Sequence, residues 1–280
     1  MIRFEDTRKR GRRDTTGKEM ALKDVGKKTD KTSSRADEVA TRDSNRTLRD
    51  CPTGVPLHLS EGEINFLWWF MMEAGIMVPE TRNHLRRAWG LCQRHAWGWL
   101  AIECSFREDF LHGPAILYED IIERAQLVFT RRLNSITWQL GLKNREQCLM
   151  CDLGYGPEST GSPNQKTLER ARDFTNLKSF ARKTHQYWGK YICGLCIGQQ
   201  NGGFICRPHL LSELAHGRLK RIDIDSEKHI FVDYLSGQVK DYSRSFRWEY
   251  RNTRTVENEA SLITAIGWCS GWTELLRILD

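Results

Sequence analysis

Residues 60–72 read Ser-Glu-Gly-Glu-Ile-Asn-Phe-Leu-Trp-Trp-Phe-Met-Met, and this stretch indicates a helical protein. Ser60 stands three residues before Glu63, which is the spacing of a capping box at the start of a helix. From Ile64 onward the stretch is apolar nearly all round, which favours burial between other helices over a position at the surface. We therefore predict a buried helix that begins after Ser60 and is ended by Pro79.

Apolar residues at three- and four-residue steps recur along the rest of the chain. Pro114 opens a predicted helix with four apolar side chains on one face, namely Leu117, Ile121, Ala125 and Val128. Gly90 is typical of a helix end. Further helical patterns cover residues 82–89, 168–188, 231–246 and 257–279, and a loop rich in Gly and Pro covers 152–167. Because no long stretch alternates like a strand, the sequence predicts a mainly α fold.

Composition separates the chain into a tail and a folded part. Residues 1–50 hold 15 Lys and Arg against 10 Asp and Glu, with one Phe and no Trp, so we expect a disordered basic tail. The rest is nearly neutral and contains all ten tryptophans, enough to fill a core. The Trp-rich segments are the predicted centre of that core: Trp68, Trp69, Trp89, Trp97 and Trp99.

The compartment is predicted from what the sequence lacks. The longest apolar run, residues 64–78, is too short for a membrane helix and is interrupted by Asn65 and Glu73. Arg12 and Arg13 are followed by a polar stretch rather than by the apolar segment of an export signal. We therefore expect a cytoplasmic protein without a membrane segment.

The cysteines indicate metal binding rather than disulfides. The chain has nine, an odd number, and most lie in Cys-x-x-Cys or Cys-x-x-His pairs. In a chain without an export signal, such pairs favour thiolate ligands over a disulfide framework. Zn²⁺ takes four such ligands in a tetrahedron, and a two-residue gap lets both members of a pair reach one ion.

The order of parts predicts two diverged helical repeats, residues 51–147 and 148–280. Each begins at a cysteine, at Cys51 or Cys148, continues through a helix to a Cys-x-x-His pair, and ends with another helix. Each Cys-x-x-His pair is also followed, five residues after the histidine, by Leu-Ala. Agreement in four ordered features favours an internal duplication.

From about Cys51 to the end, the chain resembles a bacterial family known only as a domain of unknown function, whose members carry duplicated Cys-x-x-Cys pairs and G-[FL]-C-x-x-H motifs on helical repeats. The resemblance includes Phe246-Arg247-Trp248 and Trp268 and covers about four fifths of the chain. It implies a helical, metal-binding protein and no assigned reaction. The chain departs from the family at Gly54, where the second cysteine of the first pair is replaced.

Two ligand sets are open for a zinc site in the second repeat. The repeat alignment favours a set of three cysteines and one histidine, Cys148, Cys151, Cys206 and His209. The rival set replaces the last two ligands by Cys193 and Cys196. Either set gives one Zn²⁺ per chain, and buried, unliganded cysteine is the alternative to both.

The first repeat contains only three candidate ligands, Cys51, Cys92 and His95, with Cys104 as the nearest fourth. A three-ligand zinc site with water in the fourth position is typical of catalysis. The alternative, which we favour, is a degenerate structural site, because the loss of one ligand is not evidence for chemistry.

These observations favour a zinc-stabilised helical binding or regulatory protein over an enzyme. One alternative is a metal- or thiol-dependent enzyme that uses the open site at Cys51, Cys92 and His95. The other is a nucleic-acid-associated protein that binds phosphates through basic residues of the tail, Arg8, Lys9, Arg10, Arg12 and Arg13. A protein partner is compatible with the first function, and the sequence leaves the oligomeric state open.

Overall fold

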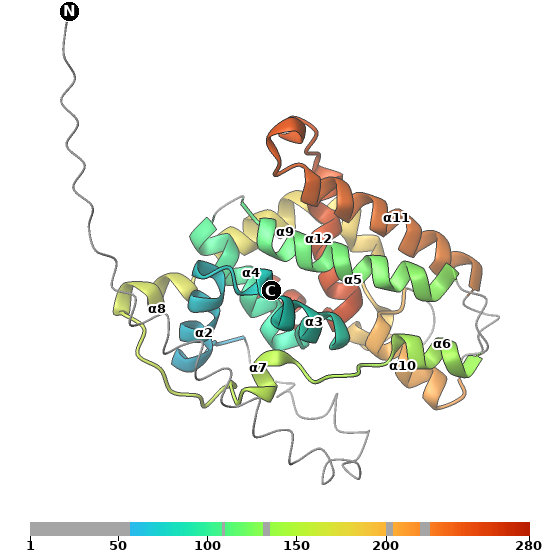
Figure 1. Cartoon of the computed structure of the whole chain (residues 1–280), viewed down its shortest axis with the longest axis horizontal. Coiled ribbons are helices and arrows are strands. Elements are labelled where there is room, and N and C mark those ends of the chain that lie inside the picture. The colour runs from blue at the N-terminus through green and yellow to red at the C-terminus, as the bar shows by residue number, and fades with distance from the viewer. Residues whose placement is uncertain (1–56, 108–109, 131–134, 200–203, 219–224) are drawn as a thin grey trace, which may run out of the picture. The chain divides into compact units, whose positions relative to one another are not determined.

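The computed structural model describes residues 57–280 except 108–109, 131–134, 200–203 and 219–224 (Figure 1). The described chain is mainly α, as predicted, and its β structure is limited to an isolated parallel bridge between Cys193 and Phe204. Within these residues no helix is both long and apolar enough to cross a membrane. The predicted basic tail, residues 1–50, and Cys51 lie outside the described residues.

The helices of the first part of the described chain are α2 (Glu61–Met72), α3 (Pro79–Arg87), α4 (Gln93–Arg107), α5 (His112–Thr130), α6 (Ser135–Leu142) and α7 (Leu149–Asp152). The later ones are α8 (Gln165–Ala171), α9 (Thr175–Trp188), α10 (Arg207–Ala215), α11 (Asp225–Arg244), α12 (Val256–Ser270) and α13 (Thr273–Leu279). Short 3₁₀ turns connect some of them: η1 (Gly75–Met77), η2 (Gly189–Tyr191), η3 (Gly194–Ile197) and η5 (Trp248–Tyr250).

Helix α2 begins as predicted but ends earlier. The Ser60 hydroxyl accepts a hydrogen bond from the Glu63 amide at 3.2 Å, and the Glu63 carboxylate accepts one from the Ser60 amide at 2.7 Å, so the capping box is present. The helix ends at Met72, whereas Pro79 is the first residue of α3. The prediction that Pro79 ends the first helix is wrong. Proline suits the first position of a helix, because the amide hydrogen that it lacks would have no partner in the first helical turn, and Pro79 therefore opens α3.

The segment between α3 and α4 turns sharply, as Gly90 predicted. Trp89 and Gly90 adopt left-handed backbone angles, with φ of 61° and 91°. The Gly90 amide donates a 2.8 Å hydrogen bond to the Leu85 carbonyl, which closes the end of α3. This turn leads directly into α4 and sets the position of Cys92, the residue before its first turn.

Helix α12 lies in the middle of the described helices, where it packs against α5, α9, α10 and α11 (Figure 1). Its Trp268 lies near aromatic rings of three other segments, those of Trp89, Phe129 and Phe231. The seven tryptophans that are fully buried are Trp89, Trp97, Trp99, Trp138, Trp188, Trp268 and Trp272. The predicted Trp-rich core is therefore confirmed, except that Trp68 is only partly buried and Trp69 is 38% exposed.

Candidate metal centres

The first Cys/His group consists of Cys92, His95, Cys148 and Cys151. Cys92 and His95 lie at the start of α4, Cys148 directly precedes the single turn of α7, and Cys151 lies within that turn. In both pairs a three-residue step along a helical turn places the two side chains on one side, so each pair points two ligand atoms at one spot. Cys148 and His95 are buried and Cys151 is exposed, so the group lies at the edge of the core.

The spacing in the first group fits a tetrahedral metal site. Nδ1 of His95 lies 3.3, 3.4 and 3.5 Å from the sulfurs of Cys92, Cys148 and Cys151. The sulfurs of Cys92 and Cys151 are 3.9 Å apart. Ordinary zinc–sulfur and zinc–nitrogen bond lengths give tetrahedron edges of about 3.8 Å between sulfurs and about 3.6 Å from sulfur to nitrogen. The four atoms therefore fit one ion.

A buried carboxylate fixes the orientation of His95. Its Nε2 lies 3.0 Å from Oε1 of Glu63, which leaves Nδ1 for a metal. Glu63 is also held by Arg94, which donates from Nε and Nη2 at 2.7 and 2.8 Å. Burial alone would raise the pKa of Glu63, but hydrogen bonds from Arg94, His95 and the Ser60 amide lower that pKa to about 2. The histidine thus faces a permanent negative charge.

The second Cys/His group consists of Cys193, Cys196, Cys206 and His209. Cys193 and Cys196 come from the η3 turn, and Cys206 and His209 from the start of α10. Nδ1 of His209 lies 3.3, 3.5 and 3.2 Å from the three sulfurs in sequence order, and the sulfurs of Cys196 and Cys206 are 3.8 Å apart. These distances match the same tetrahedron.

The buried side chain of Arg207 anchors the helix that carries half of the second group. Its guanidinium donates to the Cys269 carbonyl on α12, at 3.2 and 3.0 Å, and to the Leu142 carbonyl at the end of α6, at 2.9 Å. A third partner is the side chain of Asn144 at 2.7 Å. The first turn of α10 is therefore fixed to the core next to Cys206.

Close thiols in each group favour a cation between them. In the second group, hydrogen bonds from Cys196 and Cys206 lower the pKa of Cys193. Burial and the neighbouring thiols Cys193 and Cys196 raise the pKa of Cys206. Thiols this close cannot all lose their protons unless a positive charge lies among them. A divalent ion supplies that charge and deprotonates its thiol ligands.

The structure divides the favoured ligand set between the two groups. Cys148 and Cys151 lie with Cys92 and His95, whereas Cys206 and His209 lie with Cys193 and Cys196. Neither set of four predicted from the sequence is brought together, and two groups stand where one zinc site was expected. The reason is geometric: α7 packs against α3 next to the start of α4, and the bridge between Cys193 and Phe204 places the residues just before α10 beside η3.

Among the described residues, the candidate ligands of the first half do not form a degenerate three-ligand site of their own. Cys92 and His95 gain Cys148 and Cys151 as partners across the predicted boundary at residues 147 and 148. Cys51 lies outside the described residues, and Cys104 lies buried within α4 and outside both groups. Sequence reasoning assigned Glu63 only to the helix cap, and the reach of its side chain to His95 and Arg94 is a tertiary feature.

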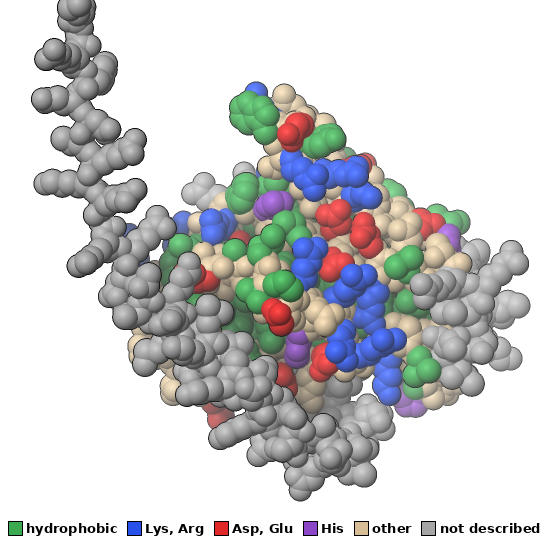
Figure 2. Space-filling model, in the orientation of Figure 1, with side chains coloured by type: hydrophobic (Ala, Val, Ile, Leu, Met, Phe, Trp, Pro, Cys, Tyr) green, Lys and Arg blue, Asp and Glu red, His purple; other side chains and the backbone are tan. Residues whose placement is uncertain are grey.

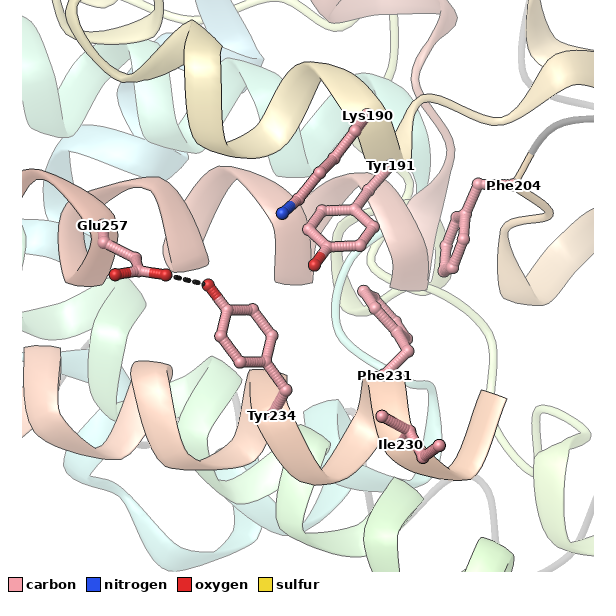
Figure 3. Close-up of a pocket in the computed structure, with 7 residues that line it drawn as sticks. All are labelled: Lys190, Tyr191, Phe204, Ile230, Phe231, Tyr234 and Glu257. Atoms are coloured by element: carbon pink, nitrogen blue, oxygen red, sulfur yellow. Dashed lines mark hydrogen bonds between the residues drawn. The ribbon is translucent and has the colours of Figure 1, made fainter. Parts of the chain in front are cut away.

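A half-open pocket of about 470 Å³ lies beside the second group, and Figure 3 shows the side chains that line it. The loop between Cys196 and Cys206 supplies Phe204, and the η2 turn supplies Lys190 and Tyr191. The remaining lining residues come from α11 and α12 and are Ile230, Phe231, Tyr234 and Glu257. The segments that carry the second group therefore also form one wall of this pocket.

Comparison of the chain with protein-family models, with curated proteins and with solved structures finds no match.

Proposed function

We propose that each Cys/His group binds one Zn²⁺ as a structural ion and that the chain is a zinc-stabilised helical binding or regulatory protein. The observation that carries this proposal is that three cysteine sulfurs surround one histidine Nδ1 twice, at 3.2 to 3.5 Å. Sulfur-rich sets of four ligands are typical of structural zinc, because thiolates prefer soft or borderline metals.

The positions of the ligands support a structural role. The first group joins the start of α4 to α7, which are more than fifty residues apart in the chain, and the second closes a loop of about ten residues between η3 and α10. A metal site of this kind exists only when the chain is folded, so the free energy of zinc binding adds to folding stability. The short turn α7, four residues long, gains most because it cannot form a stable helix alone.

The catalytic alternatives have less support from the same geometry. A catalytic zinc ion keeps one position for water, whereas each group here offers four protein ligands. A thiol nucleophile paired with its histidine would compete with the metal for the same sulfur, since Cys92 and Cys206 both lie in these groups. A binding or regulatory role leaves the remaining surface to contact a partner.

The test is the metal content of purified full-length protein, measured by elemental mass spectrometry. We expect two zinc ions per wild-type chain, one in Cys148→Ser and one in Cys206→Ser, because each substitution removes a ligand from a different group. Cys104→Ala is the control and should retain both ions, since Cys104 belongs to neither group.

Absence of metal from wild-type protein purified under reducing conditions would refute the proposal. So would the loss of both ions in the Cys104→Ala control. A single ion in the wild-type chain that both Cys148→Ser and Cys206→Ser lose would instead indicate one shared site and contradict the division into two groups.

A further inference from the structure

Residues 244–254, which run from the last residue of α11 toward the start of α12, carry a positive charge that the nearly neutral folded part does not share. This segment holds four arginines, Arg244, Arg247, Arg251 and Arg254, and one acidic residue, Glu249. We call this segment the basic tip. Figure 2 shows Lys and Arg side chains gathered around the loop that follows α11 in Figure 1.

An aromatic side chain stands at the end of the basic tip without being part of the core. Trp248 is 74% exposed, the highest exposure among the large apolar side chains that the structure describes, and Tyr250 is 44% exposed. The guanidinium of Arg251 lies 3.8 Å above the centre of the Trp248 ring. One face of the indole is thus paired with a cation, and a flat ring next to arginines is presented to the solvent.

The backbone holds these side chains in place. The Arg247 amide donates to the Arg244 carbonyl at 2.9 Å and the Tyr250 amide to the Arg247 carbonyl at 3.0 Å. The Thr253 amide then donates to the Tyr250 carbonyl at 3.0 Å. The tip is therefore a series of closed turns. A cation–π contact stabilises the base of the tip, where the Arg254 guanidinium lies 4.5 Å above the Phe246 ring.

We propose that the basic tip binds single-stranded nucleic acid, with a base stacked on Trp248 and backbone phosphates contacted by Arg244, Arg247 and Arg251. This inference names a partner for the proposed binding protein. It rests on the proposed function in one respect, which is that the zinc ions would stabilise the fold that carries the basic tip. It uses residues of the folded part and is independent of the basic tail.

The chemistry of the tip favours a single strand over other partners. Every base has an aromatic face that can stack on indole or phenol, and guanidinium groups match phosphate oxygens in pairs. A base pair inside a duplex has its faces covered by its neighbours, so Trp248 has nothing to stack on there. An acidic peptide could satisfy the arginines but offers no flat ring for Trp248, so it accounts for only half of the observation.

The test is the fluorescence anisotropy of a labelled 15-nucleotide oligothymidylate titrated with the full-length protein at several salt concentrations. Stacking of one base contributes enough binding free energy that we expect Trp248→Ala to bind the oligonucleotide about tenfold more weakly. The matched control is Trp69→Ala, which removes a 38% exposed tryptophan of α2 and should bind like the wild type. A duplex of the same length should bind more weakly than the single strand.

The charges are tested by Arg247→Glu combined with Arg251→Glu. If each arginine contacts one phosphate, the slope of log affinity against log salt should fall by about 1.4. The control with the same change in net charge is Arg12→Glu combined with Arg13→Glu in the tail. Binding lost only in the tail variant, an unchanged Trp248→Ala variant, or no binding by the wild type would overturn the inference.

Zinc content separates a failure of this inference from a failure of the proposed function. The tip variants lie outside both Cys/His groups and should retain two ions and the wild-type far-ultraviolet circular dichroism. Two ions in a wild-type protein that does not bind the oligonucleotide would refute the nucleic-acid partner and leave the zinc proposal in place.

Discussion

Glu63 contacts a helix start, an arginine and a candidate metal ligand through two carboxylate oxygens. Oε2 accepts from the Ser60 amide and from Arg94, and Oε1 accepts from Arg94 and lies next to Nε2 of His95. The side chains of Glu63 and Arg94 are 0% and 7% exposed, so the pair is buried. A buried charge that loses its partner is strongly destabilising, so Glu63 and Arg94 stabilise the fold beside the first group as a pair.

We predict that Glu63→Gln weakens zinc binding at the first group by about 10- to 100-fold, because the carboxylate that orients the histidine is lost. The second group should be unaffected. Competition with a chelating dye, which resolves the two affinities, measures both in one experiment. The matched control is Glu259→Gln, another buried carboxylate, which pairs with Lys183 on α9. Equal weakening of both groups, or of neither, would contradict the role given to Glu63.

Glu103 is a second buried carboxyl group, located on α4 away from both Cys/His groups. It is 4% exposed, and burial raises its pKa to about 7 although Trp99 donates a hydrogen bond to it and Arg107 lies nearby. Because the folded-state pKa exceeds the value of 4.5 for an unperturbed Glu, this group contributes stability that is fully present below pH 4.5. That contribution is lost as the pH rises through about 7.

We predict that Glu103→Gln stabilises the protein relative to the wild type above neutral pH. The amide cannot ionise and keeps an oxygen for Trp99, so the difference in the free energy of unfolding should approach about 3 kcal/mol at pH 8. It should shrink toward zero at pH 5. Urea unfolding of both proteins at each pH measures it, and a difference that does not change with pH would show that Glu103 ionises normally.

At the scale of elements, the loop from Leu153 to Asn164 is held against the start of α2. The Gly62 amide donates a 3.0 Å hydrogen bond to the Ser159 carbonyl, and the Ser60 hydroxyl donates to the Gly156 carbonyl at 2.8 Å. A Cβ atom on Gly161 would lie 2.6 Å from the Glu61 carbonyl oxygen. Two backbones therefore approach so closely that only glycine fits at this position.

We predict that Gly161→Ala lowers the free energy of unfolding by about 1 to 3 kcal/mol, because a methyl group there must displace backbone rather than a flexible side chain. Gly156→Ala is the control in the same loop, since a Cβ there meets no atom within 4 Å. The control should be neutral or slightly stabilising. Equal stability of the two variants would mean that the loop does not pack on α2 in solution.

At the scale of the whole molecule, the two candidate metal groups differ in the order of their ligand pairs along the chain. In each, a Cys-x-x-His pair opens a helix, α4 or α10, but its Cys-x-x-Cys partner follows in the first group and precedes in the second. The first group therefore crosses the boundary between the predicted repeats. The duplication stays a prediction, and the division at residues 147 and 148 does not assign one complete metal group to each repeat.

The sequence alone was enough for local features. The capping box at Ser60, the turn at Gly90 and the burial of Trp89, Trp97 and Trp99 are confirmed, because each depends on a few neighbouring residues or on apolar side-chain size. The mainly α class follows from the same local periodicity. The cysteine pairs were also identified correctly as units, since a two-residue gap restricts both side chains to one side of a turn.

Only the tertiary structure decided which pairs meet. A two-residue spacing fixes the ligands within a pair, but the partner pair depends on how α7 lies next to α4 and how the start of α10 lies next to η3. These contacts are set by packing around α12 and by buried groups such as Arg207 and Glu63, which join residues far apart in the chain. Sequence distance is a weak guide to such contacts, because each doubling of the length of a loop adds only about 0.6 kcal/mol to the cost of closing it.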